Sequence, residues 1–305
     1  MPSVGVVMNQ PVLPTRDGVG ASCVSLPDGP WATITDFLEH RFAHQPREVW
    51  LQRMRSGEVV DEHGDAVTEQ RPYQSHLKVY YYRGVDYEPR IPFDEVLLFQ
   101  DAHLAVVDKP HFLPVAPSGH YLQETVLVRL KRRLGINTIV PIHRIDRDTA
   151  GVVMFSLQPE TRDRYHALFR DHAVHKTYEA IASWRADLQL PLTRESRLAP
   201  AVHFMQQQEV HGSGNTTTHI RLLERQGAMA RYELRPVTGH RHQLRVHMAA
   251  LGVPIQGDGL YPELTPEGPA DYSRPLQLLA KSIAFSDPLS GLQRRFDSQR
   301  QLKLG

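Results

Sequence analysis

Near the N-terminal end of the chain, apolar residues recur at the three- and four-residue spacing that predicts helices. The first predicted helix covers residues 34–42 and can be capped by Thr33 or by Thr35. The second covers residues 46–55, because a proline suits the first turn of a helix and Gly57 ends it. This part of the chain therefore predicts two consecutive short helices.

A small β-region follows these helices. Two β-prone stretches flank a turn at residues 62–64, and residues 77–82 predict a further strand. With the helices they define a first domain over residues 31–83. Residues 1–30 are rich in Pro, Gly and Ser and lack the basic start and apolar core of a secretory signal, so we expect a loose N-terminal arm.

A second pattern begins after residues 84–93, which contain two prolines and predict a linker. Apolar runs at residues 96–99 and 104–110 predict a hairpin of two buried strands. An amphipathic helix follows at residues 123–134, with four cations, Lys131 among them, largely outward. Polar residues 190–214 predict loops over short strands. Further elements are expected at residues 159–171 (helix), 175–180, 216–223, 228–236 and 276–285 (strands), within a second domain over residues 94–305.

Composition excludes several classes of protein. The chain has 305 residues and a formal net charge of +1, and no apolar run approaches the roughly 18 residues of a membrane span. Cys23 is its one cysteine, which excludes a disulfide framework and a cysteine zinc site within one chain and favours the cytoplasm. Because the net charge is near zero, a nucleic-acid partner would have to be bound by a local surface rather than by global charge.

The most informative stretch is His-Arg-Ile-Asp-Arg-Asp-Thr-Ala-Gly at residues 143–151, ahead of an apolar run at residues 152–155. Two acids and two arginines are followed by a glycine, which suits a tight entry into a buried strand. The charged residues are thus expected at the mouth of a strand, where a cation can hold an Asp and chemistry is common. Taken alone, the stretch is more typical of a loop with a surface ion pair, as most such charge clusters are.

A second polar stretch is Thr-Gly-His-Arg-His-Gln-Leu-Arg-Val-His at residues 238–247, followed by Gly-Asp-Gly-Leu-Tyr at residues 257–261. On a helix begun at Gly239, His242 and Arg245 share one face beside the core-facing residues. The histidines do not indicate a metal site, because residues two apart on a helix do not face one point and no second carboxylate is nearby.

In order and spacing, these motifs resemble the RluA-type pseudouridine synthases. The family pattern is His-Arg-Leu-Asp, two variable residues and Thr-Ser-Gly, then a Lys-x-Tyr strand, then Thr-Gly-Arg-(Thr/Ser)-His-Gln-(Ile/Leu)-Arg-Val-His. This chain departs from the pattern at Ile145, Ala150, the pair His240-Arg241, and Asp287 in place of a usual His. The resemblance covers residues 93–291 and implies an α+β fold, with a mixed, mostly antiparallel central sheet and flanking helices.

Residues 31–83 are similar to the small αL-type RNA-binding domain of ribosomal proteins and RNA-modifying enzymes. This resemblance implies a small α/β N-terminal domain in which Arg47, Arg53 and Arg55 meet phosphates. The alternative is a helix with a solvated basic face.

The larger resemblance implies isomerisation of uridine to pseudouridine in structured RNA, without cofactor or metal. Asp146 is then the essential carboxylate, acting as a nucleophile toward the sugar or the ring, or as a base on the ribose. Arg245 keeps Asp146 ionised. Tyr178 stacks on the flipped base, and its hydroxyl can take the proton from the newly bonded carbon. A noncatalytic RNA-binding protein is the alternative.

The remaining site residues are implied in binding RNA or shaping the site. Arg144 enters the RNA helix where the base was removed. His143 is expected to hold the turn and line the substrate site, and Lys176 either contacts phosphate or ends a strand. His242 and Arg241 complete the set expected to bind substrate. Ribosomal RNA is favoured over tRNA because an N-terminal RNA-binding module is commoner in that branch, and a monomer is favoured.

Overall fold

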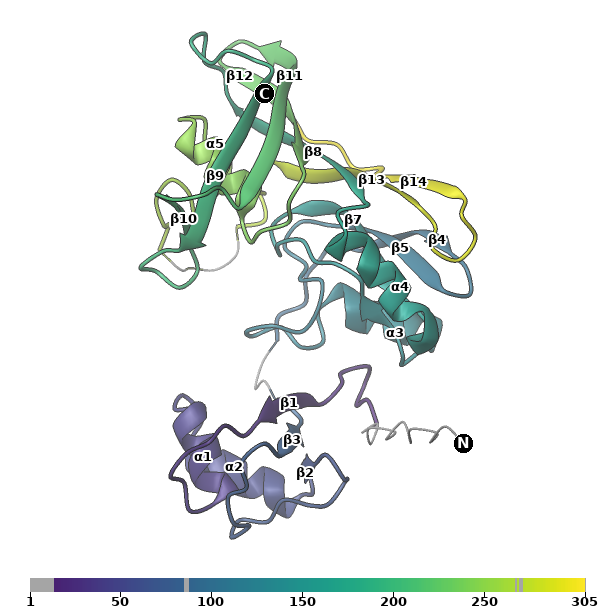
Figure 1. Cartoon of the computed structure of the whole chain (residues 1–305), viewed down its shortest axis with the longest axis vertical. Helices are drawn as coiled ribbons and strands as arrows, with labels where there is room; N and C mark the ends of the chain where they lie inside the picture. The colour runs from purple at the N-terminus through teal and green to yellow at the C-terminus, as the bar shows by residue number, and fades with distance from the viewer. Residues whose placement is uncertain (1–13, 85–87, 267, 269–270, 305) are drawn as a thin grey trace. The chain divides into compact units, whose positions relative to one another are not determined.

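The computed structural model of the chain describes residues 14–84, 88–266, 268 and 271–304 (Figure 1). By its internal contacts the chain divides into two compact units, Met1–Glu88 and Pro89–Gly305. The start of the predicted arm, residues 1–13, and the centre of the predicted linker, residues 85–87, lie outside the described residues. Within the described residues, no helix is long and apolar enough to cross a lipid bilayer.

The first unit is a three-stranded antiparallel sheet in the order β1-β3-β2, together with two helices. Thr33 caps α1 in a capping box, in which its hydroxyl accepts from the amide of Asp36 and the Asp36 carboxylate accepts from the amide of Thr33. Phe37 and Trp50 bring the two helices together over the buried face of the sheet. The elements are β1 (Ser22–Ser25), α1 (Ile34–Arg41), α2 (Arg47–Arg55), β2 (Val59–Asp61) and β3 (Lys78–Tyr81).

The expectation of a loose arm before this unit is wrong in part. Residues 22–25 pair with β3 over four residues, and the next residue, Leu26, is buried in the unit's core. This strand forms because β3 offers a free edge for it to pair with. The short, polar sequence of residues 22–25 does not itself indicate that such an edge is available. Cys23 lies exposed on this strand.

The second unit is built on one sheet in the order β10-β9-β11-β12-β8-β13-β7-β5-β4, with β14 beside β13 and β6 beside β7. Its pairs are antiparallel except for β13 and β7, which are parallel. The mixed, mostly antiparallel sheet expected from the sequence is confirmed. The strands are β4 (Val96–Gln100), β5 (Leu104–Lys109), β6 (Val140–Pro141), β7 (Ala150–Ser156), β8 (His175–Ser183), β9 (Leu192–Pro200), β10 (Gln207–Val210), β11 (Thr216–Gln226), β12 (Met229–Pro236), β13 (Leu278–Ser286) and β14 (Gln293–Asp297).

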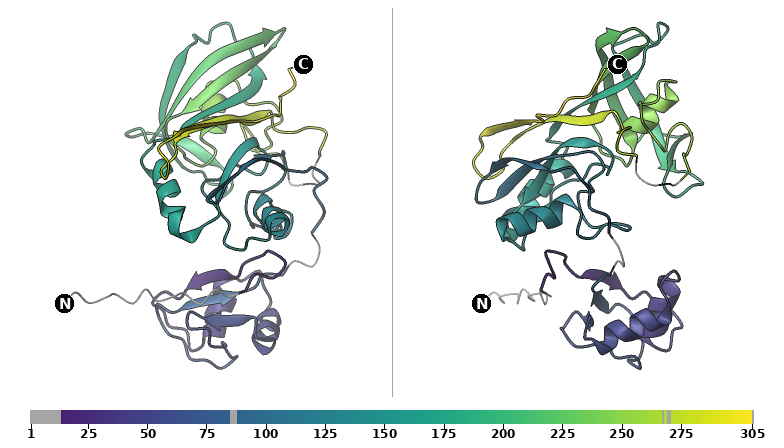
Figure 2. Two further views of the ribbon diagram at one scale, coloured as in Figure 1. Left: turned by 90° about the vertical axis from the view of Figure 1, so that its right-hand side faces the viewer. Right: turned by 180° about the vertical axis from the view of Figure 1, so that it is seen from behind.

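In the described part of this unit, three helices cover the sheet. α3 (Val126–Leu134) packs on the face of β5 and β7 that carries Val107 and Val153, whereas α4 (Pro159–Arg170) packs on the opposite face, which carries Val106 and Met154 (Figure 1). α5 (Gln243–Ala250) packs on β8, β11 and β12, which the views in Figure 2 show side by side. Because β5 and β7 are covered on both faces, their sequences are continuous apolar runs rather than alternating ones.

Several details differ from the sequence expectations. Residues 91–93 are not a linker, because Ile91 is in the core and its amide donates to Glu124. β4 is partly exposed rather than buried. On α3, Lys131 is buried, and Arg129 points inward to hold Glu124 and Glu95 with its guanidinium. β9 is a regular strand of nine residues inside the stretch expected to be mainly loops.

Gly151 occupies a position in the central motif where any side chain would collide with the neighbouring strand. Its φ is +114°, and a Cβ built on it would lie 2.2 Å from the carbonyl oxygen of Ala280, which it faces across the parallel pair of β7 and β13. The glycine therefore allows the two strands to lie close together directly after the motif loop.

Changing Gly151 to Ala should lower the free energy of unfolding by about 3 kcal/mol, because it adds backbone strain and a collision with a main-chain oxygen. Chemical denaturation measured by circular dichroism tests this. Gly135→Ala is the matched control, since Gly135 also has a positive φ of 68° but a Cβ added there would have open space within 4 Å. Equal losses for both variants would show that the collision at Gly151 is relieved cheaply.

Candidate active site

One cleft of the second unit, with a volume of about 1540 Å³, contains all eight side chains selected from the sequence. The loop before β7, the start of β8 and the loop before α5 each contribute part of its wall. These three segments are far apart in the chain and are brought together by the sheet order. The eight residues are His143, Arg144, Asp146, Lys176, Tyr178, Arg241, His242 and Arg245.

A chain of three charged side chains lies at the base of this cleft. Arg245 donates from Nε and Nη2 to both oxygens of Asp258, at 2.8 and 2.6 Å, and from Nη1 to Oδ2 of Asp146 at 3.2 Å. Arg245 and Asp258 are buried, whereas the Asp146 side chain is 28 % exposed. A guanidinium fixed on one side by a bidentate carboxylate therefore presents its remaining donor group, Nη1, to Asp146, whose side chain faces the cleft.

Asp258 is itself held by its turn, which explains the orientation of Arg245. Its Oδ1 accepts from the amides of Leu260 and Tyr261 at 2.8 and 3.1 Å. Burial lowers the pKa of Arg245, but hydrogen bonding and charge from Asp258, with a further contribution from Asp146, raise it overall. The buried cation is thus paired on both sides, as a buried charge must be.

A second chain of contacts reaches the other oxygen of Asp146. The Nε2 atom of His242 lies 3.7 Å from Asp146 Oδ1, and its Nδ1 lies 2.9 Å from the hydroxyl of Tyr261. That hydroxyl accepts from the amide of Gln207 at 2.7 Å, which leaves its proton for His242 Nδ1. Burial lowers the pKa of His242, which favours the neutral ring. In this arrangement its Nε2–H faces Asp146.

Tyr178 lies on β8 between Leu234 of β12 and Ala280 of β13. Its ring packs against the apolar cluster under α5 and also lines the cleft. Burial, followed by the negative charge of Asp146, raises the pKa of its phenol well above the ordinary value. The hydroxyl therefore stays protonated at neutral pH, which favours a stacking role over that of a general base.

The three cations expected to bind substrate differ in how they are held. Arg144 is exposed in the cleft and makes no hydrogen bond or ion pair with any residue in the described part of the chain. Lys176 donates to the carbonyl of Thr238 at 3.0 Å, and burial lowers its pKa. Arg241 donates to the carbonyls of Phe204 and Met205 at 3.2 and 3.1 Å. Arg144 is therefore the most available of the three for an external anion.

His143 is used inside the protein. Its Nε2 accepts from the amide of Met154 at 3.1 Å, and its ring stacks on Phe169 with centroids 4.7 Å apart. Burial, assisted by the charge of Lys176, lowers its pKa to about 3. These contacts match the expected turn-holding role, although one edge of the residue also lines the cleft.

The helix expected to begin at Gly239 begins four residues later, at Gln243. The Gln243 side chain accepts from the Thr238 hydroxyl at 2.8 Å and the His240 amide at 3.1 Å, so it closes the preceding residues into a loop. His242 ends this loop with a φ of 56°. His242 and Arg245 still approach the same acid, but from the loop and the helix respectively rather than from one helical face.

Sequence reasoning assigned no role to Lys109 and His111, which support the motif loop. The fully buried ammonium of Lys109 donates to the carbonyls of Pro110, Leu113 and Arg147, at 2.9, 2.8 and 2.8 Å. Burial lowers its pKa to about 7, against the opposing charges of Asp148 and Asp146. His111 Nδ1 lies 2.7 Å from the carbonyl of Asp148. The sequence feature that could have identified Lys109 is the Asp-Lys-Pro end of a buried strand, because a buried lysine must find hydrogen-bond acceptors inside the protein.

Buried neutral histidines predict acid sensitivity. Burial lowers the pKa of His111 to about 4, of His143 to about 3 and of His247 to about 4, all below the ordinary value near 6.5. Because the unfolded chain takes up these protons first, the stabilisation is complete above pH 6.5 and is lost as pH falls toward 4. Each histidine should lower the free energy of unfolding by about 1–2 kcal/mol between pH 7 and 5.

Urea unfolding at half-unit pH intervals measures this loss. His247 hydrogen-bonds the hydroxyls of Ser196, Thr216 and Thr218, so His247→Gln keeps polar contacts while removing one titrating group. The unfolding free energy of His247→Gln should fall less steeply with decreasing pH than that of the wild type, and the difference should equal the contribution of one histidine. The exposed His219→Gln serves as control and should retain the wild-type slope; a wild-type slope for His247→Gln as well would refute the assignment.

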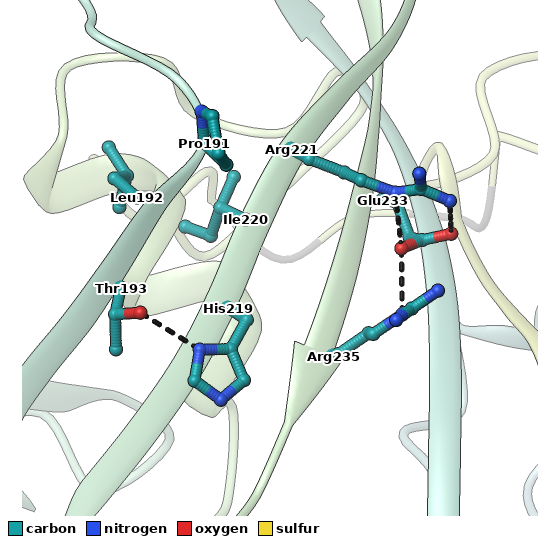
Figure 3. Close-up of a pocket in the computed structure, with 8 residues that line it drawn as sticks. All are labelled: Pro191, Leu192, Thr193, His219, Ile220, Arg221, Glu233 and Arg235. Atoms are coloured by element: carbon teal, nitrogen blue, oxygen red, sulfur yellow. Dashed lines mark hydrogen bonds and ion pairs between the residues drawn. The ribbon is translucent and has the colours of Figure 1, made fainter.

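A smaller pocket of about 250 Å³ lies on the surface of β9, β11 and β12 (Figure 3). Glu233 accepts from Arg221 at 2.6 and 2.7 Å and pairs with Arg235 at 2.7 Å, and Thr193 hydrogen-bonds His219 (Figure 3). Because its charged groups already satisfy one another, this pocket offers a ligand little compared with the larger cleft.

Known proteins resemble this chain in sequence and in fold. A family model described as RNA pseudouridylate synthase matches residues 103–250. An uncharacterized RNA pseudouridine synthase of Synechocystis is 30 % identical, with 75 % of this chain and 79 % of the relative aligned. The dual-specificity RNA pseudouridine synthase RluA of Yersinia pestis is 31 % identical, over 68 % of this chain and 99 % of the relative.

Among solved structures, human RNA pseudouridylate synthase domain containing 1 has a TM-score of 0.57 at 19 % identity, covering 70 % of this chain and 86 % of that one. The fold is therefore the pseudouridine synthase fold, and the protein is an RNA-modifying isomerase. More narrowly, the chain belongs to the RluA family of RNA pseudouridine synthases.

Proposed function

We propose that this enzyme isomerises specific uridines of structured RNA, with Asp146 as the essential carboxylate and with ribosomal RNA as the favoured substrate. The observation that carries the proposal is the line of contacts Asp258–Arg245–Asp146, which ends at an oxygen facing the 1540 Å³ cleft. The three sequence motifs converge on this point. A carboxylate that is fixed yet open to a cleft has the geometry required of a group that meets substrate.

The chemistry is balanced within the substrate. The bond from ribose C1′ to ring N1 breaks, the base turns, and a bond from C1′ to ring C5 forms. C5 then loses its proton and N1 gains one, so no redox partner is needed. Asp146 acts as a nucleophile toward the sugar or the ring, or as a base on the ribose. Arg245 holds the carboxylate in place for each of these routes, through the hydrogen bond from its Nη1 to Asp146 Oδ2.

The target base must leave its stack to reach Asp146. Tyr178, whose ring lines the cleft beside that acid, supplies a face for the flipped base. Arg144 is an exposed cation two residues before Asp146 in the chain, and we assign it to the space in the RNA helix that the base vacates. Lys176 and Arg241 are anchored to backbone carbonyls, which suits positioning better than direct phosphate contact.

The first unit is proposed to bind RNA as well, although through fewer arginines than the sequence indicated. Arg47 pairs with Asp36 and Glu39, and Arg55 pairs with Glu48 and Glu69. Phosphate contact then falls mainly to Arg41 and Arg53, which lie over Phe42 and Trp50. An additional RNA-binding unit supports the preference for ribosomal RNA. A Saccharomyces cerevisiae relative, 30 % identical over 75 % of this chain and named a mitochondrial tRNA pseudouridine(32) synthase, requires tRNA to be tested too.

A pseudouridine map of total RNA tests the proposal. Carbodiimide labelling followed by reverse transcription is performed on cells with and without the gene, and with the gene restored. We expect one or a few stops in ribosomal RNA to vanish in the deletion and to return only with the intact protein. Lost stops in tRNA alone would correct the substrate, and an unchanged map of both RNAs would refute the proposal for these classes.

A further inference from the structure

The loop between β9 and β10 carries an unusual surface. Among the described residues, Val202 and Phe204 are the most exposed large apolar side chains, at 104 % and 76 % of full exposure. Phe204 and Met205 also line the large cleft, whereas Val202 does not. An aromatic ring is therefore presented to water at the wall of the site that receives the substrate, where burying it would be favourable.

This loop is held in place rather than loosely attached. Within it, the amide of Ala201 donates to the Gln206 carbonyl at 3.1 Å, and the amide of Gln206 donates to the His203 carbonyl at 2.9 Å. From outside, Arg241 donates to the carbonyls of Phe204 and Met205. The side chain of Gln206 donates to the carbonyl of Leu260, on the turn that holds Asp258. The exposed ring thus stands on a fixed backbone.

The loop is also linked to Asp146, through Tyr261 and His242. Its last residue precedes Gln207, whose amide donates to the Tyr261 hydroxyl at 2.7 Å. Tyr261 hydrogen-bonds His242, which lies 3.7 Å from Asp146. A displacement of the loop would therefore pass through two contacts to the environment of Asp146. Arg241 takes part as a positioning residue, because its guanidinium contacts the loop backbone.

We infer that Phe204 stacks on a nucleobase of the bound RNA, beside the uridine that enters the cleft. The inference rests on the proposed function, and it assigns Phe204, on the loop at residues 201–206, to substrate recognition. A nucleotide is the fitting partner because it combines an aromatic base with an adjacent phosphate, and the same cleft carries the exposed cation Arg144. Stacking of bases on aromatic side chains contributes substantially to binding of unpaired RNA. A partner protein with an apolar surface could stack on Phe204 but would leave the charge of Arg144 uncompensated.

The test uses the full-length protein and ribosomal and transfer RNA purified from cells that lack the gene. Filter retention gives the apparent Kd, and single-turnover assays at saturating enzyme give the rate of pseudouridine formation. For Phe204→Ala we expect a Kd about tenfold weaker. Phe204→Trp keeps a stacking face and should stay within about twofold of the wild type. The matched control Val202→Ala removes an even more exposed apolar side chain from the same loop, and should leave Kd unchanged.

The outcomes separate this inference from the proposed function. Equal Kd values for Phe204→Ala and Val202→Ala would overturn the stacking role, whether or not the wild-type enzyme modifies the RNA. A failure of the wild-type protein to form pseudouridine in these RNAs would instead count against the proposed substrates, while the Kd values would still decide the role of Phe204. Thermal unfolding of each variant should match the wild type, because the replaced ring is mostly exposed.

Discussion

The Asp146→Asn variant should form pseudouridine at least about 10⁴-fold more slowly than the wild-type protein while binding the same RNA with similar affinity. Asparagine keeps the shape of the side chain and an oxygen that can accept from Arg245, so the loop should retain its geometry. It lacks the negative charge needed to attack the sugar or ring or to remove a proton. The loss therefore falls on chemistry rather than on binding.

Single-turnover assays at saturating enzyme measure this loss, and circular dichroism verifies the fold. Asp148→Asn is the matched control, because Asp148 lies two residues away in the same loop and in the same cleft, but pairs with Arg147 at 2.9 Å. Its rate should stay within about tenfold of the wild type. Substantial turnover by Asp146→Asn would exclude a covalent or basic role for the carboxylate and reduce Asp146 to a structural part of the loop.

The sequence predicted the site residues because the motifs combine polarity with position in the fold. An acid placed just before a glycine and a buried strand has to emerge at the strand's mouth, and Gly151 confirms the tight entry with a φ of +114°. The close contact of Arg245 with Asp146 followed from family resemblance, and the structure places the two groups 3.2 Å apart. The catalytic roles of these residues stay predictions until they are tested.

What the sequence did not predict depends on turns and on long-range burial. Asp258 lies in a Gly-Asp-Gly-Leu-Tyr turn whose return to Arg245 has no periodic signature, although it provides that arginine's strongest contacts. The sequence likewise has no helical or strand pattern that indicates which three carbonyls Lys109 contacts. The late start of α5 comes from the side chain of Gln243, which competes locally with helical hydrogen bonding.

Charged helices were a further source of error, because sequence alone does not indicate which cations find acids. On α3, Arg129 satisfies Glu124 and Glu95 inside the domain, although periodicity places it outward. On α2, Arg47 and Arg55 each form ion pairs with carboxylates of the same unit. Such pairs remove positive charge that a simple count assigns to RNA, so the surface available to phosphates is smaller than the composition of these helices indicates.

Asp258→Asn is expected to reduce both stability and turnover. The buried side chain of Arg245 would lose its bidentate carboxylate partner. The amide nitrogen of the new asparagine would then face an N–H donor of Arg245 where a carboxylate oxygen now accepts. Breaking a buried ion pair at one partner costs about 3–5 kcal/mol of unfolding free energy. The freed guanidinium also loses the restraint that aims Nη1 at Asp146, so we expect turnover to fall about 10²-fold as positioning is lost.

The exposed pair Arg185–Asp187 provides the control for this prediction. Arg185 also contacts both oxygens of Asp187, but the two side chains are 44 % and 67 % exposed. Asp187→Asn should therefore change the unfolding free energy by less than about 1 kcal/mol and leave turnover intact. Urea unfolding and single-turnover rates are measured on both variants. If Asp258→Asn loses stability but keeps its rate, Asp146 is held by contacts other than Arg245; if it loses neither, the buried pair does not organise the site.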